Sequence, residues 1–263
     1  MSELWANYRE FCQFRRMAEE SQVLDLSELN FVYPTTLLPL TMLLVRNNYA
    51  VKLPRNSNVQ SYIEVVTNAA RFDCQSWKKS YLPLVPLPRN QDEVISILQT
   101  IYRIHDNGRS CGGEDAFKYL IGELVENIYE HSEFSSSWVM AQAYERGGHM
   151  DICFFDDGIT INGCFRKHGM GYERDSEAIR GAIEGVTTKG EGRGYGLNSN
   201  VAIFTTGMKG AIFIVSGQGA VEIQRDSFIE YDLEKTYELP GTLITVRIPY
   251  PARVVNIYDY LEK

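Results

Sequence analysis

The sequence predicts a mixed protein of the α/β or α+β class, with a small N-terminal unit over residues 1–82 and a larger unit over residues 83–263. Patterns typical of strands and helices alternate through the first unit, which indicates a small α/β layer. Pro83, Pro86 and Pro88 then fall within six residues, and such a cluster is typical of a break between structural units. Beyond this break, two long helical patterns are followed by several short apolar runs.

Composition narrows the class of protein further. The 263 residues are 44% hydrophobic and 23% charged, as in chains that bury a substantial core. The formal charge of −8 disfavours non-specific nucleic-acid binding, because the mean field of the protein repels phosphate backbones. Five cysteines without a C-x-x-C pair indicate neither a disulfide framework nor a zinc knuckle. The start lacks the apolar core of a signal peptide, and no apolar run approaches the roughly 20 residues of a membrane span. We therefore expect a cytoplasmic protein without a membrane segment.

The N-terminal unit reads as alternating helices and strands. Its first helix is expected because apolar and charged residues recur at helical spacing. Pro34 is tolerated in the first turn of a helix and therefore opens the second one. In chain order, we expect a helix over 3–20, a strand over 23–26, a helix over 35–47, a strand over 49–53 and a helix near 61–70.

The larger unit begins with two strong helical patterns and continues as strands. Asn90 and Asp92 are both suitable caps for the first of these helices. Short apolar runs bounded by turn residues predict the strands. In chain order, we expect helices over 92–105 and 116–131, strands over 138–144 and 150–155, a glycine-rich stretch over about 158–196, and strands over 211–216, 221–223 and 242–248.

Three polar residues share one face of the helix expected over 116–131. Glu123, Asn127 and His131 follow one another at four-residue spacing, which lines them up along a helix. An acid, an amide and an imidazole in one row can position water, bind a hard cation through oxygen and contact a nucleotide. The same pattern is typical of the solvated stripe of an amphipathic helix, and in isolation it favours that interpretation.

A pair of carboxylates, Asp156 and Asp157, follows the apolar run that ends at Phe155, and Gly158 comes next. Asp-Gly between apolar runs is a common signal for a hairpin turn. The alternative interpretation is functional, because a buried carboxylate at the end of a strand can accept a hydrogen bond from the exocyclic amine of adenine. The pattern alone leaves both interpretations open.

Four glycines alternate along the chain at Gly190, Gly192, Gly194 and Gly196, and an apolar pattern resumes at Leu197. Such a loop can bring backbone N–H groups close to phosphates at the start of the following helix. The spacing fits neither a Rossmann fingerprint nor a P-loop. A flexible surface loop is the alternative, but alternating glycines carry an entropic cost that favours a function.

These three segments and the Pro240-Gly241-Thr242 turn before the last strand resemble, in this order, the motifs of the GHKL (Bergerat-fold) ATPase superfamily. That superfamily includes histidine kinases, gyrase B subunits, heat-shock chaperone ATPases, mismatch-repair ATPases and anti-sigma-factor serine kinases. The resemblance covers about residues 84–249 and is closest to the serine kinases and histidine-kinase-like ATPase domains. It implies a two-layer α/β sandwich that binds Mg-ATP.

The resemblance also implies a role for each motif residue. Asn127 would bind the Mg²⁺ that bridges the phosphates, and Glu123 would act as the general base. Asp156 would bind the adenine amine, and residues 162–190 would form a mobile lid. The other cofactor-binding positions would be His131, Gly158 and Thr242 near the base and helix, and Lys189, Gly192, Gly194, Gly196 and Leu197 near the phosphates.

Two positions depart from the family pattern: Asp157 stands where the family often has Asn, and Thr160 where it usually has a second glycine. Residues 20–80 resemble, more weakly, an STAS-like domain, the fold of anti-sigma-factor antagonists. In those proteins a Ser or Thr at a helix start is phosphorylated, and Thr35 or Thr36 falls near that position. Because the preceding residues differ from the antagonists' motif, we expect a docking or dimerisation layer in place of a phosphosite.

The expected function is an Mg-ATP-binding protein of cytoplasmic signalling that hydrolyses ATP slowly or transfers phosphate to a protein Ser/Thr. Glu123 favours this interpretation, because a carboxylate can take a proton from water or a hydroxyl. The alternative is a non-catalytic, ATP-gated protein-binding module that switches partners by lid closure. Either function predicts a protein partner or a homodimer.

Overall fold

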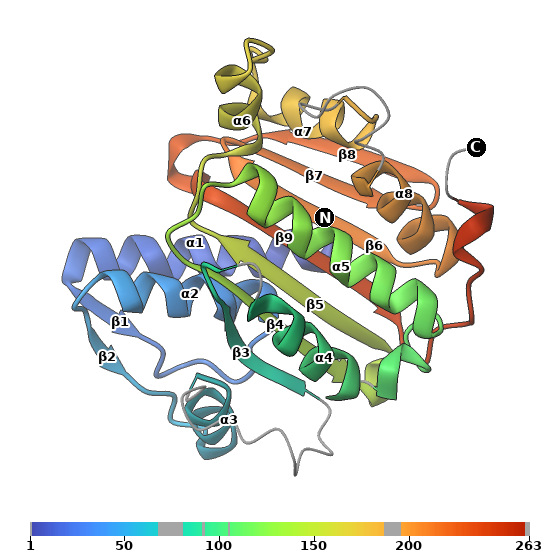
Figure 1. Cartoon of the computed structure of the whole chain (residues 1–263). Coiled ribbons are helices and arrows are strands. Elements are labelled where there is room, and N and C mark those ends of the chain that lie inside the picture. Colours follow the sequence, from blue (N-terminus) through green and yellow to red (C-terminus); the bar gives the residue numbers. More distant parts are fainter. Residues whose placement is uncertain (1, 68–80, 91–92, 105, 187–195, 261–263) are drawn as a thin grey trace.

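The centre of the molecule is a seven-stranded antiparallel sheet with helices on both faces (Figure 1). The structure, a computed structural model, describes residues 2–67, 81–90, 93–104, 106–186 and 196–260. The strand order is β3-β4-β5-β9-β6-β7-β8. The strands are β3 (Tyr81–Leu87), β4 (Ser137–Tyr144), β5 (His149–Asp156), β6 (Ala211–Gly217), β7 (Gly219–Gln224), β8 (Ser227–Asp232) and β9 (Leu239–Pro249).

The central strands are buried on both faces, because alternate side chains point to opposite sides of a sheet. In β5, Ile152 and Phe154 belong to one hydrophobic cluster, whereas Cys153 and Phe155 belong to a second cluster on the other side. An antiparallel sheet often leaves one face in water and then alternates apolar with polar residues. Here helices cover both faces, so β4, β5, β6 and β9 read as nearly continuous apolar runs.

The first face of the sheet is covered by helices from the C-terminal part of the chain. The longest of them, α5, buries residues at intervals of three and four, among them Phe117, Leu120, Leu124 and Ile128, which is the signature of a helix with one apolar side. These helices are α4 (Val94–Ile104), α5 (Glu114–His131), α6 (Ile161–Lys167), α7 (Asp175–Ile183) and α8 (Gly196–Ala202), which continues as a π-helical turn, Ile203–Gly207.

The N-terminal segment covers the second face, where α2 contacts β4, β5 and β9. Trp5 of α1 stacks on Tyr231 of β8 with 4.8 Å between ring centroids. Arg247 of β9 pairs with both oxygens of the buried Asp151 and also with Glu3 of α1. The elements are α1 (Glu3–Ser21), α2 (Pro34–Arg46) and α3 (Ser57–Thr67), with a parallel pair of short strands, β1 (Val23–Asp25) and β2 (Ala50–Lys52). The N-terminal segment and the large sheet therefore share one hydrophobic core.

The prediction of a mixed α and β fold is confirmed, and most of the expected elements are present. One expectation is wrong: the segment with Pro83 and Pro86 is not a break in the chain but edge strand β3. Proline fits an edge strand because the backbone N–H that it lacks has no partner strand to bind there. The ladder between β3 and β4 shifts register between Leu82 and Val85, on either side of Pro83.

Strand β8 was not expected from the sequence, because most of its residues are exposed and show no apolar alternation. The remaining short elements are single 3₁₀ turns at Asp106–Gly108, Glu145–Gly147, Lys235–Tyr237 and Ile257–Asp259. Among the described residues, no helix has both the length and the apolar character that crossing a membrane requires.

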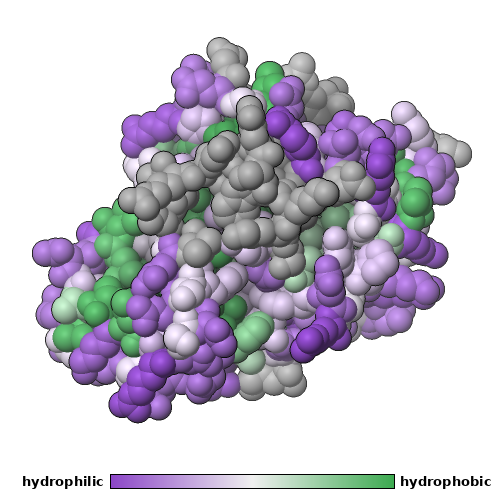
Figure 2. All heavy atoms as spheres, turned by 90° about the horizontal axis from the view of Figure 1, so that it is seen from below, coloured by the Kyte–Doolittle hydropathy of each residue, from purple (hydrophilic) through white to green (hydrophobic). Residues whose placement is uncertain are grey.

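Apolar side chains also reach the surface of the N-terminal segment. Phe31, Val45, Val51 and Leu53 each expose a large part of their area. The view from below shows hydrophobic residues gathered on that side of the molecule (Figure 2).

Candidate functional site

Segments that belong to three of the four motifs meet at one end of the sheet. Strand β5 ends at Asp156, which lies opposite Thr242 at the start of β9. Thr242 in turn lies opposite Ser216 near the end of β6. The last turn of α5 joins the same region through Ser132, whose carbonyl accepts a hydrogen bond from Ile159 N at 2.6 Å.

Asp156 is a carboxylate that the fold almost removes from solvent, with 3% of its area exposed. Its pKa is raised from 3.8 to about 7, chiefly because burial penalises the charged form. The neighbouring charge of Asp157 acts in the same direction, while hydrogen bonds from Gly158 N, at 3.0 Å, and with Ser132 act against it. No cation pairs with Asp156 among the described residues.

Gly158 is required by the close approach of the turn after β5 to the end of α5. A Cβ atom at this position would lie 1.9 Å from the carbonyl oxygen of Ser132, a distance that no pair of unbonded atoms tolerates. Gly241 plays a similar part on β9, because its φ is +110° and a Cβ there would lie 2.1 Å from the carbonyl oxygen of Asp156. Two glycines thus let three backbone segments pack around Asp156.

Hydroxyl groups line the neighbouring strand ends. The Ser216 and Thr242 hydroxyl oxygens are 3.0 Å apart, and Ser216 Oγ also accepts a hydrogen bond from Ile161 N at 2.9 Å. Ser216 and Ser132 were not identified from the sequence. Each looks there like an ordinary residue at the end of an element, and only the packing of distant segments brings it to the site.

The row on α5 is partly buried. Glu123, Asn127 and His131 are half-buried, whereas Glu126 and Glu130 on the same helix are exposed. His131 Nδ1 lies 3.8 Å from Cys164 Sγ of α6. The row is therefore distinct from the solvated face of α5, which the glutamates at 126 and 130 occupy.

Helix α8 begins at Gly196, the last of the four alternating glycines of the sequence, with Leu197 half-buried next to it. Ser199 shares a hydrogen bond with Tyr119 of α5, so the two helices are in contact. Asn200 is fully buried, and neither atom of its amide has a hydrogen-bond partner among the described residues. Lys189, Gly192 and Gly194 lie outside the described residues.

The two residues that differ from the pattern of the resembled superfamily, Asp157 and Thr160, each have hydrogen-bond partners in the structure. The Asp157 carboxylate is bonded on both oxygens: its Oδ1 accepts hydrogen bonds from Ser135 N and Ser136 N, each at 2.7 Å, and its Oδ2 pairs with Arg46. Thr160 caps α6 by accepting a hydrogen bond from Gly163 N at 3.0 Å. The Asp157-Gly158 turn leads into α6, so the hairpin interpretation of Asp-Gly is wrong.

The segment expected as a lid contains two helices, and α7 contributes buried apolar side chains to the core. Ala178, Ile179 and Ile183 of α7 are buried, and the helix contacts β6, β7 and β8. Asn162 of α6 donates a hydrogen bond to Asp175 of α7 at 2.8 Å, so the two helices are tied together.

Thr35 and Thr36 are both fully buried. The Thr35 hydroxyl lies 3.2 Å from that of Thr245, and Thr36 donates to the carbonyl of Asn7 at 2.9 Å. Both hydroxyls are therefore enclosed by the contacts between α1, α2 and β9.

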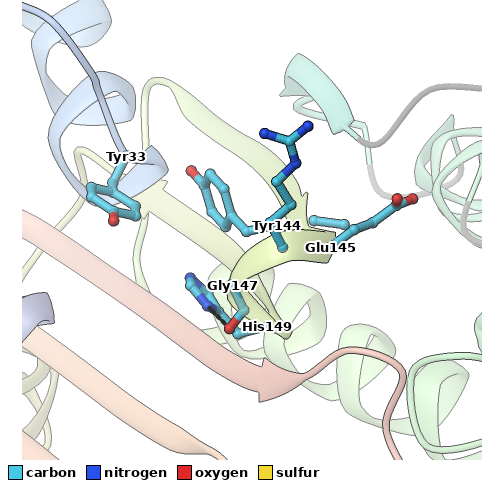
Figure 3. Close-up of a pocket in the computed structure, with 7 residues that line it drawn as sticks. Tyr33, Tyr144, Glu145, Gly147 and His149 are labelled. Atoms are coloured by element: carbon cyan, nitrogen blue, oxygen red, sulfur yellow. Dashed lines mark hydrogen bonds between the residues drawn. The ribbon is translucent and has the colours of Figure 1, made fainter.

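A pocket of about 440 Å³ lies elsewhere, at the other end of β4 and β5 (Figure 3). Tyr33, Tyr144 and His149 line it, with ring centroids 5.3 Å apart for the two tyrosines and 4.9 Å for Tyr144 and His149. Strand β5 runs from His149 to Asp156, which separates the pocket from the carboxylate by about 23 Å at about 3.3 Å per residue. The pocket is therefore not part of the site around Asp156.

Comparison of the sequence with protein-family models and with curated proteins found no match. Among the described residues, no group of three or more His, Cys, Asp and Glu side chains could hold a metal ion.

Proposed function

We propose that the chain binds Mg-ATP at the end of the sheet around Asp156, and that it hydrolyses ATP slowly or transfers its phosphate to a Ser or Thr of a partner protein. The observation that carries the proposal is the Asp156 carboxylate, buried without a cation beside it. Such a group costs stability, and groups with strongly shifted pKa values concentrate at functional sites. The motif order along the chain supports a nucleotide as the ligand.

The surroundings of Asp156 fit an adenine base. A carboxylate accepts hydrogen bonds from an exocyclic amine, which adenine carries and which guanine replaces with a carbonyl at the corresponding position. Gly158 adds no side chain beside the carboxylate, and the Thr242 and Ser216 hydroxyls offer further polar contacts. The donors and acceptors of this end of the sheet therefore favour ATP over GTP.

Asn127 is the residue proposed for the magnesium ion, because Mg²⁺ prefers oxygen ligands and is commonly completed by substrate phosphates. ATP supplies the transferable phosphoryl group. Glu123 lies one helical turn before Asn127, where its carboxylate would take the proton of the attacking water or hydroxyl. Contacts of Lys189, Gly192 and Gly194 with the phosphates are proposed from the sequence resemblance.

A second candidate function, an ATP-gated binding module, is favoured by one contact. Arg46 belongs to the N-terminal segment, yet it pairs with Asp157, the residue after Asp156. Through this ion pair, a nucleotide bound at the site would affect the segment that exposes Phe31 and Val45. In this function ATP changes which surface a partner meets, and turnover is incidental.

Nucleotide selectivity tests the proposal. Titration calorimetry of the full chain with ATP and with GTP, each with Mg²⁺ and with EDTA, should show binding of ATP that weakens when Mg²⁺ is removed. Asn127→Ala should lose the Mg²⁺ dependence, while Glu126→Ala, an exposed position on the same helix, should behave like the wild type. Equal affinity for ATP and GTP, or none for either, would overturn the adenine assignment.

The two candidate functions differ in the effect of Glu123→Gln. The substitution keeps shape and hydrogen bonding but removes the base. If the chain is an enzyme, ATP affinity should be retained while phosphate release or partner labelling falls by about 10²–10⁴-fold. A wild type that binds ATP but neither releases phosphate nor labels a partner supports the gated module.

A further inference from the structure

The end of helix α2 reaches the turn that follows Asp156. Arg46, the last residue of α2, forms an ion pair with Asp157. The two side chains are unequally exposed: 40% of the Arg46 side chain is accessible to solvent, but only 4% of the Asp157 side chain. The N-terminal segment thus supplies the cation for a carboxylate that is itself buried.

Asp157 holds the turn through several bonds at once. One carboxylate oxygen accepts hydrogen bonds from the backbone N–H groups of Ser135 and Ser136, and the backbone N–H of Asp157 donates to Ser136 O at 3.1 Å. The second oxygen faces Arg46. A buried charge is costly unless it is paired, and the Arg46 guanidinium is the pairing charge for Asp157 in this position.

The N-terminal segment also holds the strand that lies opposite. Arg15 of α1 donates hydrogen bonds to the carbonyls of Glu238 at 2.6 Å and Thr236 at 2.8 Å, and Tyr8 donates to Tyr237 O at 2.7 Å. These carbonyls lie just before the part of β9 that carries Thr242. Both strand ends that flank the proposed base-binding site are therefore fixed by α1 and α2.

We infer that Arg46 is a positioning residue of the nucleotide site, which acts by neutralising Asp157 and so holds the turn that carries Asp156. The inference rests on the proposed function, and it means that the N-terminal segment helps to position the nucleotide site. Loss of the guanidinium leaves the Asp157 charge unbalanced beside Asp156 and opposes ionisation of the Asp156 carboxylate. Binding of the adenine amine then weakens and requires a higher pH.

Other charged or titratable groups belong to the elements packed around this end of the sheet. They remain unchanged in the test below, so their contribution cancels between variants. They are His131 and Glu133 at the end of α5, Cys164 and Lys167 of α6, and Asp175 of α7.

The test compares ATP affinity across a range from about pH 6 to about pH 8.5 for the full chain and three variants. Arg46→Gln removes the positive charge, whereas Arg46→Lys keeps it. Arg55→Gln is the control, because it removes a positive charge elsewhere in the N-terminal segment. Arg55 pairs with Glu28 at 2.6 Å, and its side chain is 76% exposed. Thermal melts of each variant show whether it is folded. The titration of ATP itself is common to every curve and cancels.

Arg46→Gln should bind ATP roughly three- to tenfold more weakly at about pH 7, with the pH midpoint of binding moved upward. Arg46→Lys should recover most of the affinity, and Arg55→Gln should match the wild type. Equal affinities and equal midpoints for wild type and Arg46→Gln overturn the inference while leaving the ATP site intact. If Arg46→Gln weakens binding with no midpoint shift, the residue is only structural and the inference is wrong. A wild type that binds no ATP overturns the proposed function itself, along with the inference.

Discussion

Asp156 is buried, where the charged form of a carboxylate is unfavourable, and the proposed chemistry of the site depends on that burial. Burial raises its pKa to about 7, so this group changes its protonation near neutral pH. A side chain that served only the fold would be replaced at low cost by an amide, which hydrogen-bonds without carrying a charge. The consequence can be measured in the stability of the protein as well as in the proposed nucleotide binding.

Asp156→Asn should make the protein more stable above pH 7. The folded-state pKa of Asp156 is higher than the value of 3.8 expected for an unfolded chain, so between these values the folded state holds more protons than the unfolded one. Wild-type stability therefore falls as pH rises from about 4 to about 7. At about pH 8 the variant should be more stable by a few kcal/mol, on the order of 1.4 kcal/mol per unit of pKa shift.

Urea unfolding of both proteins at several pH values checks this expectation. The two stability curves should meet near pH 4 and separate as the pH rises. Curves that stay parallel throughout would mean that folding does not raise the pKa of Asp156.

Sequence patterns anticipated some of these residues and not others. Asp156, Gly158 and Thr242 carry a local signal, because the first two follow an apolar run and Thr242 belongs to a turn that precedes one. Ser132, Ser216 and Arg46 carry none, since each acts through a contact with a segment far away in the chain. Only the packed structure brings such residues to the site.

At the scale of elements, α5 was predicted closely because its apolar residues recur with a helical period over five turns. The central strands were recognised from short apolar runs, although they are buried on both faces and show no alternation. Strand β3 was misread because proline is a strong signal for a break. Proline is tolerated in an edge strand, but whether a strand lies at the edge depends on the whole sheet and not on the local sequence. Strand β8 was missed for a related reason, since an exposed edge strand needs no apolar pattern.

The junction between α5 and the turn after β5 makes a prediction of its own. In Gly158→Ala, the new Cβ would meet the backbone carbonyl of Ser132, so the helix end and the turn must separate. The free energy of unfolding should fall by roughly 1–3 kcal/mol, as for other overpacked positions, and ATP binding should be lost or much weakened.

A glycine within α5 provides the matched control. A Cβ at Gly122 would find its nearest neighbour, the Tyr102 hydroxyl, at 3.8 Å, an ordinary contact. Gly122→Ala should leave ATP binding unchanged and raise stability, by up to about 1 kcal/mol, because alanine is the better helix former. Chemical denaturation measures the free energy of unfolding of both variants. A Gly158→Ala protein that is as stable as the control and binds ATP equally well would refute the close packing of the turn.

At the scale of the whole molecule, the N-terminal segment is the part that sequence reasoning placed least well. Its elements were recognised, but their place on the second face of the sheet, where they complete a shared core, was not foreseen. The contacts responsible join residues more than 200 positions apart, such as Trp5 with Tyr231 and Glu3 with Arg247. No local pattern encodes them.

The most direct test of the account is the position at which ATP binds. Photolabelling the full chain with an azido-adenine analogue of ATP, followed by peptide mapping, locates the base without assuming any residue role. The account predicts labelled peptides that contain the turn at 156–161 or the start of β9 at 239–243, with labelling suppressed by excess ATP and not by GTP. Labelling confined to the pocket of Tyr33, Tyr144 and His149, or no labelling that ATP suppresses, would contradict it.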